Sequence, residues 1–162
     1  MIGLFCGLAL AGKWDGKPSD VVASQTIQAP PSAVYGVITN LDALGEAWAD
    51  ECISEWVVSG SRVTVKYAIG VFKRRVPAVL ANVVPDRSVD LEHEGRRGFT
   101  TRWKLEPAGD GTLVTMTTFL SAPPWPVTGT YFTTVKPEWE ACQADVLAGI
   151  AAISAGGGAS AP

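Results

Sequence analysis

Side chains alternate over residues 24–28 with the period of two that is typical of a half-buried strand, and the strand is expected over about 21–29. Pro30 and Pro31 then prevent continued pairing in a sheet, because proline lacks a backbone N–H group. Pro31 suits the first turn of a helix, where that group would be unpaired anyway. The next hydrophobic residues recur at the three- and four-residue spacing of one helix face, and they are Val34, Val37, Ile38 and Leu41. We therefore expect a strand followed at once by a helix over 31–39.

A second short helix is expected over 41–48, and Asn40 or Asp42 is able to cap its first backbone N–H groups. From residue 52 to residue 121, runs rich in valine and threonine alternate with turn residues, which predicts an antiparallel meander. Six strands are expected there, over 53–58, 62–69, 72–84, 88–93, 99–106 and 113–120.

The last helix is expected from Pro137 onward, because hydrophobic residues recur every three or four residues on one face. This stripe consists of Trp139, Cys142, Val146, Ile150 and Ile153. Residues 128–134 are rich in glycine and threonine and indicate either a loop or a loose first turn. We divide the chain into an N-terminal extension over 1–20, one domain over 21–154 and a flexible Gly/Ala/Ser tail over 155–162. The order of elements predicts an α+β fold, with the long helix lying across a curved seven-stranded antiparallel sheet.

Short motifs along this order carry a family resemblance. They are IQAPPSAVY at 27–35, the helix over 41–48 that ends in tryptophan, VVP at 83–85, and TRWKLEP at 101–107 followed by GTLVTM at 111–116. In these motifs the chain resembles the START-like, or SRPBCC, superfamily, and most closely its polyketide cyclase/dehydrase and lipid-transport type. The resemblance implies a helix-grip fold with an elongated cavity between the sheet and the last helix. Different members use that cavity for lipids, steroids, plant hormones, polyketide intermediates or no identified ligand.

The net charge of −3 argues against a nucleic-acid partner, because phosphate binding needs a clustered cationic surface. Beyond its apolar start, the chain has no run near the roughly 20 apolar residues of a membrane span, so no stable membrane insertion is expected. The expected partner is a hydrophobic small molecule, bound by a monomer or a homodimer. Neither a metal nor a cofactor is expected.

The three cysteines, Cys6, Cys52 and Cys142, show no paired spacing and no Cys/His cluster, so we expect reduced thiols in a cytoplasmic protein. We expect Cys52 and Cys142 to be small residues of the hydrophobic core rather than nucleophiles. Residues 2–10 are apolar and precede a small-x-small sequence that resembles a cleavage site, but no basic residue comes before them. We therefore prefer to interpret these residues as an apolar tail or as the result of a start codon assigned too early. Export by a signal peptide is the alternative.

Strand parity selects candidates for the cavity wall, because alternate side chains face the same side of a sheet. His93 is the only histidine and shares the parity of the apolar residues in its strand. His93 and Tyr67 are the candidate catalytic residues, which would act by proton transfer. A lone histidine at a strand end is also typical of a residue that is simply solvated or hydrogen-bonded. The expected ligand-binding residues are Trp48, Tyr67, Leu91, His93, Phe99, Thr101, Trp103, Met116, Trp139, Cys142 and Val146.

Three functions fit these residues. The first is binding of a lipid-like or polyketide-like molecule, with the tryptophans either stacking on it or simply filling the core. The second is an aromatase/cyclase-type enzyme that acts on a polyketide-like intermediate by proton transfer. The third is a protein-interaction module whose cavity has collapsed.

Overall fold

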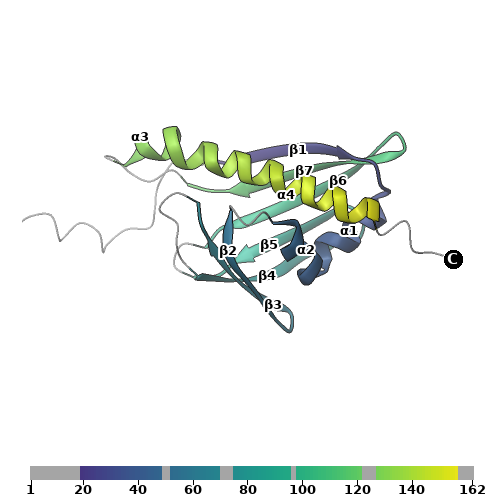
Figure 1. Cartoon of the computed structure of the whole chain (residues 1–162), viewed down its shortest axis with the longest axis horizontal. Helices are drawn as coiled ribbons and strands as arrows, with labels where there is room; N and C mark the ends of the chain where they lie inside the picture. Colours follow the sequence, from purple (N-terminus) through teal and green to yellow (C-terminus); the bar gives the residue numbers. More distant parts are fainter. Residues whose placement is uncertain (1–18, 49–51, 70–74, 96–97, 122–126, 157–162) are drawn as a thin grey trace, which may run out of the picture.

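The elements follow one another in the expected order (Figure 1). The computed structural model describes residues 19–48, 52–69, 75–95, 98–121 and 127–156. The strands are β1 (Val21–Ile27), β2 (Ile53–Ser59), β3 (Arg62–Tyr67), β4 (Arg75–Val84), β5 (Ser88–His93), β6 (Thr100–Ala108) and β7 (Gly111–Phe119). The helices are α1 (Pro31–Thr39), α2 (Leu41–Ala47), α3 (Thr128–Thr130), the π-helical turn η1 (Tyr131–Val135) and α4 (Lys136–Gly156).

All seven strands form one curved antiparallel sheet in the order β1-β7-β6-β5-β4-β3-β2. Helix α4 runs along one face of this sheet, and α1 and α2 lie beside its C-terminal half (Figure 1). This arrangement confirms the helix-grip fold predicted from the order of elements. None of the helices in the described residues is long and apolar enough to cross a membrane.

The two short helices begin and end where proline and asparagine permit. Pro30 is the N-cap of α1 in an extended conformation, and Pro31 occupies the first turn, where its missing N–H group costs nothing. The side-chain oxygen of Asn40 accepts hydrogen bonds from the backbone N–H groups of Asp42 (3.1 Å) and Ala43 (3.2 Å). Asn40, rather than Asp42, is therefore the cap of α2.

Residues 128–135 form helical turns that lead into α4, so the loop interpretation of 128–134 is wrong and the loose first turn is right. The hydroxyl group of Tyr131 donates a hydrogen bond to the backbone carbonyl of Ser19 at 3.3 Å. The N–H group of Ser19 in turn donates to the carbonyl of Leu120 at 2.8 Å. These hydrogen bonds connect η1, the turn that leads into α4, to the edge of the sheet beside β1 and β7.

The core lies between the sheet and α4, and the buried residues alternate along the strands as the parity predicts. On β3 and just beyond it, Val63, Val65, Tyr67 and Ile69 are buried. Leu91 and His93 on β5 and Thr101 and Trp103 on β6 are buried on the same face. The candidate ligand-binding residues therefore face the interior, apart from Phe99, which is only half-buried.

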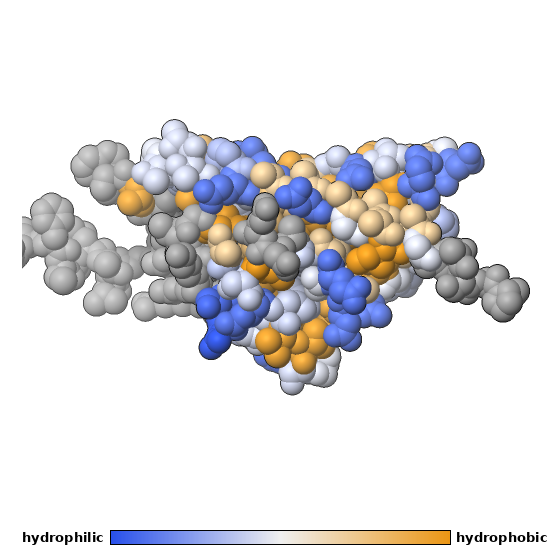
Figure 2. Space-filling view, in the orientation of Figure 1, coloured by the Kyte–Doolittle hydropathy of each residue, from blue (hydrophilic) through white to orange (hydrophobic). Residues whose placement is uncertain are grey.

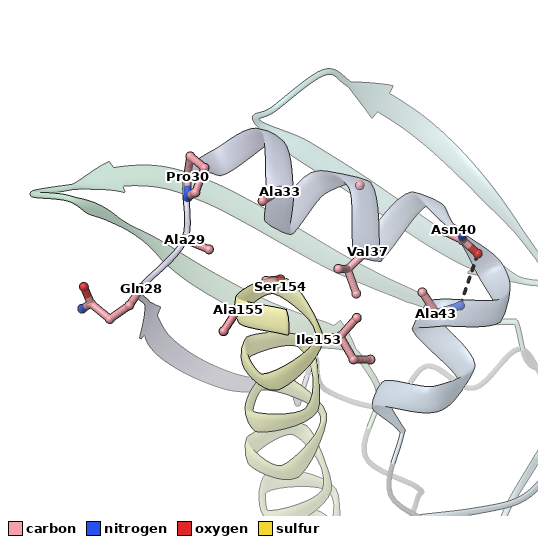
Figure 3. Close-up of a pocket in the computed structure, with 11 residues that line it drawn as sticks. Gln28, Ala29, Pro30, Ala33, Val37, Asn40, Ala43, Ile153, Ser154 and Ala155 are labelled. Carbon is pink, nitrogen blue, oxygen red and sulfur yellow. Dashed lines mark hydrogen bonds between the residues drawn. The ribbon is translucent and has the colours of Figure 1, made fainter. Parts of the chain in front are cut away.

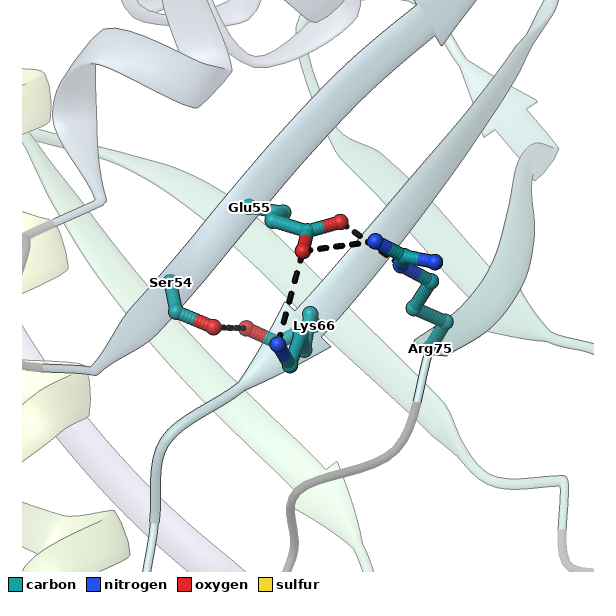
Figure 4. A network of polar contacts seen from close by, with 4 residues as sticks. All are labelled: Ser54, Glu55, Lys66 and Arg75. Atoms are coloured by element: carbon teal, nitrogen blue, oxygen red, sulfur yellow. Dashed lines mark hydrogen bonds and ion pairs between the residues drawn. The ribbon is translucent and has the colours of Figure 1, made fainter.

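The outer face of the sheet carries ion pairs. The guanidinium group of Arg75 on β4 contacts both carboxylate oxygens of Glu55 on β2, at 2.7 and 2.8 Å (Figure 4). Lys66 on β3 lies 3.4 Å from the same carboxylate, and its backbone carbonyl accepts a hydrogen bond from Ser54 (Figure 4). The hydrogen bond with Arg75 lowers the pKa of Glu55. These exposed pairs link three neighbouring strands at the surface.

A disulfide joins Cys52, at the start of β2, to Cys142 on α4. The expectation of reduced thiols is therefore wrong for these two residues. They are 90 residues apart in sequence, with Cα atoms 5.7 Å apart, so only the packing of α4 on the sheet brings them together. The cytoplasmic location was inferred from reduced cysteines. Because structural disulfides are rare in the cytosol, the cysteines no longer support that inference.

Candidate ligand site

Five aromatic side chains from four parts of the chain pack together between the sheet and α4. We call them the aromatic cluster: Trp48, Tyr67, His93, Phe99 and Trp139. Tyr67 is central, because its ring centroid lies 5.1 Å from that of Trp139, 5.7 Å from that of Trp48 and 5.9 Å from that of Phe99. The imidazole of His93 stacks on Phe99, with centroids 3.9 Å apart and an interplanar angle of 14°. The cluster joins the ends of β3 and β5 to the first turns of α4.

The two candidate catalytic residues are hydrogen-bonded to each other inside this cluster. The Tyr67 hydroxyl group lies 2.5 Å from Nε2 of His93, and Nδ1 of His93 lies 3.2 Å from the carbonyl oxygen of Phe99. A carbonyl only accepts, so Nδ1 carries the proton of a neutral imidazole and Nε2 accepts from Tyr67. The Tyr67 hydroxyl therefore donates its proton to His93 and keeps its oxygen lone pairs as acceptors.

Burial controls the protonation of this pair. His93 is only 4% exposed, and desolvation lowers its pKa from 6.5 to about 4, against the raising effect of its backbone hydrogen bonds. Desolvation also raises the pKa of Tyr67 well above its ordinary value of 10. At neutral pH both groups are therefore uncharged. Of the two alternatives for a non-catalytic His93, the solvated one is wrong, because the histidine faces the core, and the hydrogen-bonded one agrees with the structure.

Three indole N–H groups are buried without a hydrogen-bond partner among the described residues, and they belong to Trp48, Trp103 and Trp139. Each of these side chains is at most 3% exposed. The indole of Trp56 differs, because it donates to the backbone carbonyl of Leu41 at 2.8 Å. An unpaired buried donor costs about 1–3 kcal/mol, so three of them in one interior are unusual for an ordinary core.

Two buried polar residues were missed by the sequence interpretation. Gln143 on α4 donates from Nε2 to the hydroxyl oxygen of Thr118 on β7 at 2.6 Å. That oxygen lies 3.0 Å from the hydroxyl of Thr101 on β6. We call these three residues, all fully buried, the polar cluster. The available signal was the position of Gln143, which lies four residues after Trp139 and therefore on the same helix face.

A separate groove of about 460 Å³ lies where the end of α4 meets α1 and α2 (Figure 3). Its walls include Ala33 and Val37 of α1 and Ile153 of α4, and hydrophobic residues are visible there at the surface (Figure 2). Ser154 lies 15 residues after Trp139, which corresponds to about 22 Å along a helix. No titratable side chain is among the residues that line the groove. The buried titratable residues His93 and Tyr67 instead belong to the aromatic cluster.

Residues 18–150 match the family model described as "Polyketide cyclase / dehydrase and lipid transport". The chain belongs to this family. Comparison with curated proteins found no match. The family description covers both catalysis and transport, so membership fits a ligand-binding or a cyclase role without deciding between them.

Several solved structures share the fold of this chain. The solution structure of the KanY protein has a TM-score of 0.70 at 20% identity, covering 86% of this chain and 99% of that chain. The crystal structure of a protein from Thermus thermophilus has a TM-score of 0.64 at 18% identity, with the same coverage. The di-domain ARO/CYC StfQ from the steffimycin biosynthetic pathway has a TM-score of 0.61 at 12% identity, covering 85% of this chain and 51% of that chain. At these identities the likeness establishes the fold alone.

Proposed function

We propose that this protein binds a neutral, hydrophobic small molecule between the sheet and α4. The observation that carries the proposal is the set of unpartnered indole N–H groups of Trp48, Trp103 and Trp139 in an interior lined by aromatic rings. Aromatic walls with a few convergent polar groups are typical of small-molecule sites. Ligand oxygens would pair with these donors, which a purely structural core would leave unpaired.

The charges of the interior indicate that the ligand is neutral. Among the described residues the only buried carboxylate or cation is Asp90. Asp90 lies opposite Arg102 in the register of β5 and β6 and binds the Arg102 guanidinium at 2.7 Å, on the outer face of the sheet. A charged ligand in the interior would therefore lose its hydration without finding a counter-ion. Burial of about 300 Å² of apolar ligand surface contributes about 7 kcal/mol at about 25 cal/mol per Å², before the loss of translational freedom.

The Tyr67–His93 hydrogen bond favours a second candidate, an aromatase/cyclase-type enzyme. In such a reaction an acidic substrate proton would pass to the Tyr67 oxygen while the Tyr67 proton passes to Nε2 of His93. The imidazolium would later return that proton to a departing hydroxyl group, which leaves as water. A pKa of about 4 makes His93 a weak base at neutral pH, since an effective general base has a pKa near 7. We therefore place ligand binding first and catalysis second.

Native mass spectrometry of the protein purified from its own host tests the proposal. We expect a bound neutral compound that is retained under native conditions and released on denaturation. A released compound that becomes lighter by one water on incubation with wild-type protein, but not with Tyr67→Phe protein, would instead support the cyclase. Protein that carries no small molecule, and shows no thermal shift with fatty acids, sterols or aromatic polyketides, would contradict both candidates.

A matched pair of tryptophan variants separates binding from stability. Trp139→Phe keeps an aromatic ring and removes an unpartnered donor, whereas Trp56→Phe removes a donor that binds the Leu41 carbonyl. With 2-naphthol as a calorimetric probe, we expect Trp139→Phe to weaken binding several-fold at unchanged stability. Trp56→Phe is expected to reduce stability by about 1 kcal/mol and to leave binding unchanged. Equal binding by both variants would count against the interior as the site.

A further inference from the structure

Gln143 is placed where a hydrophobic residue is expected. It lies on the face of α4 that packs on the sheet, between the buried residues Trp139 and Val146, and it is fully buried itself. Glutamine is rarely fully buried, because its amide has to find partners for both a donor and an acceptor. A methionine or leucine would occupy about the same volume without that requirement.

The hydrogen bonds of the polar cluster satisfy only part of the Gln143 amide. Nε2 donates to the Thr118 hydroxyl oxygen, and that oxygen exchanges a hydrogen bond with Thr101, its partner in the β6–β7 register. The side-chain carbonyl oxygen of Gln143 has no hydrogen-bond partner among the described residues. In this arrangement the two threonines engage the amide nitrogen and leave the acceptor of the amide unused.

Gln143 is also close to the aromatic cluster. Residues four apart on a helix have Cβ atoms about 5–6 Å apart, which places the Gln143 side chain beside that of Trp139. The Trp139 ring in turn lies within 6 Å of Tyr67 and Phe99, at 5.1 and 5.8 Å between centroids. A ligand that lies against Trp139 is thus close to both the Tyr67–His93 pair and the side chain of Gln143.

We propose that Gln143 is a specificity-determining residue whose side-chain carbonyl accepts a hydrogen bond from a hydroxyl group of the bound molecule. The inference rests on the proposed function, which it deepens by naming the ligand class as neutral ring compounds with a free hydroxyl. Thr118 and Thr101 are positioning residues, because they act on the ligand only through the amide of Gln143. A ligand with only acceptor groups at this position would leave the carbonyl unpaired, and so it would bind more weakly.

Calorimetry with three probes of similar shape tests the inference. The probes are 2-naphthol, which donates a hydrogen bond, 2-methylnaphthalene, which has a methyl group in its place, and 2-acetylnaphthalene, which only accepts. We expect Gln143→Met to weaken binding of 2-naphthol about tenfold and to leave the affinity for 2-methylnaphthalene unchanged or higher. Gln143→Leu serves as a second variant, and urea denaturation of both variants checks that the fold is retained.

The outcomes separate the two proposals. Equal loss of affinity for 2-naphthol and 2-methylnaphthalene, or no loss for either, would overturn the role of Gln143 while leaving ligand binding intact. A selective loss for 2-acetylnaphthalene would overturn the assignment of the carbonyl as the contacting atom. Failure of the wild-type protein to bind any of the three probes would contradict the proposed function and, with it, this inference.

Discussion

The burial of His93 makes the stability of the protein depend on pH in a defined window. Unfolded histidine has a pKa of 6.5, whereas desolvation lowers the pKa of His93 in the folded state to about 4. Between these values the unfolded chain binds a proton that the folded chain does not, so unfolding becomes more favourable as the pH falls. The stability is fully present above pH 6.5 and is lost progressively down to about pH 4. At about 1.4 kcal/mol per pH unit, the loss amounts to about 3 kcal/mol.

His93→Gln is the matched variant, because a glutamine oxygen is able to accept the Tyr67 hydroxyl hydrogen bond but does not titrate. We expect the difference in unfolding free energy between wild type and variant, measured by urea denaturation, to change by about 3 kcal/mol from pH 7 to pH 4. Acidic groups such as Asp90 and Glu55, whose pKa values are lowered by Arg102 and Arg75, titrate in both proteins and cancel in the difference.

The same prediction has a spectroscopic check. His93 is the only histidine in the chain, so its imidazole signals in an NMR titration need no assignment. We expect a neutral ring protonated on Nδ1 throughout the range above pH 5, because Nε2 accepts from Tyr67. A pKa near 6.5, or a difference in stability that stays flat between pH 7 and pH 4, would refute the reasoning that the ring is buried and desolvated.

Two further predictions concern the attachment of α4. Reduction of the Cys52–Cys142 disulfide is expected to lower the unfolding free energy by about 4.6 kcal/mol, because the bond closes a loop of 90 residues. Alkylation of denatured protein should label one cysteine before reduction and three after it, and three labels without reduction would show that the bond is absent. Gly149→Ala is expected to cost about 1–3 kcal/mol in urea denaturation, since an added Cβ on α4 would collide with the Ala47 carbonyl oxygen. Gly36→Ala is the control, because its Cβ meets nothing within 4 Å, and an equal cost for both would contradict this packing.

Local chemistry made the first half of the fold predictable. The prolines at 30 and 31 and the alternation before them leave few conformations open, and the predicted helix over 31–39 coincides with Pro31–Thr39. The predicted strand over 88–93 coincides with Ser88–His93, because turn residues bound it on both sides. The start of β4 is less defined by the sequence, and residues 72–74 of the predicted third strand of the meander lie outside the described residues.

Contacts between distant segments were not predictable from one sequence. The disulfide and the polar cluster both depend on how α4 is rotated on the sheet. The predicted stripe ends at Ile153, whereas the structure buries Ser154 and leaves Ile153 half-buried. A stripe built only from apolar residues therefore follows the helix face imperfectly, and it omitted Gln143.

The pairing of Tyr67 with His93 was predictable only in part. Parity placed both side chains on the inner face, but their hydrogen bond joins β3 to β5 across β4. Sequence spacing does not encode that distance. The stacking of His93 on Phe99 likewise depends on the chain turning back between β5 and β6.

The central claim is that the interior between the sheet and α4 binds a neutral small molecule. An NMR titration of ¹⁵N-labelled protein with 2-naphthol, monitored at the indole N–H signals, tests this claim most directly. We predict that the signals of Trp48, Trp103 and Trp139 shift together and saturate, because these donors lack partners, while that of Trp56, which binds the Leu41 carbonyl, stays in place. Saturable shifts confined to Trp56, or no shift at any of the four indoles, would contradict the account.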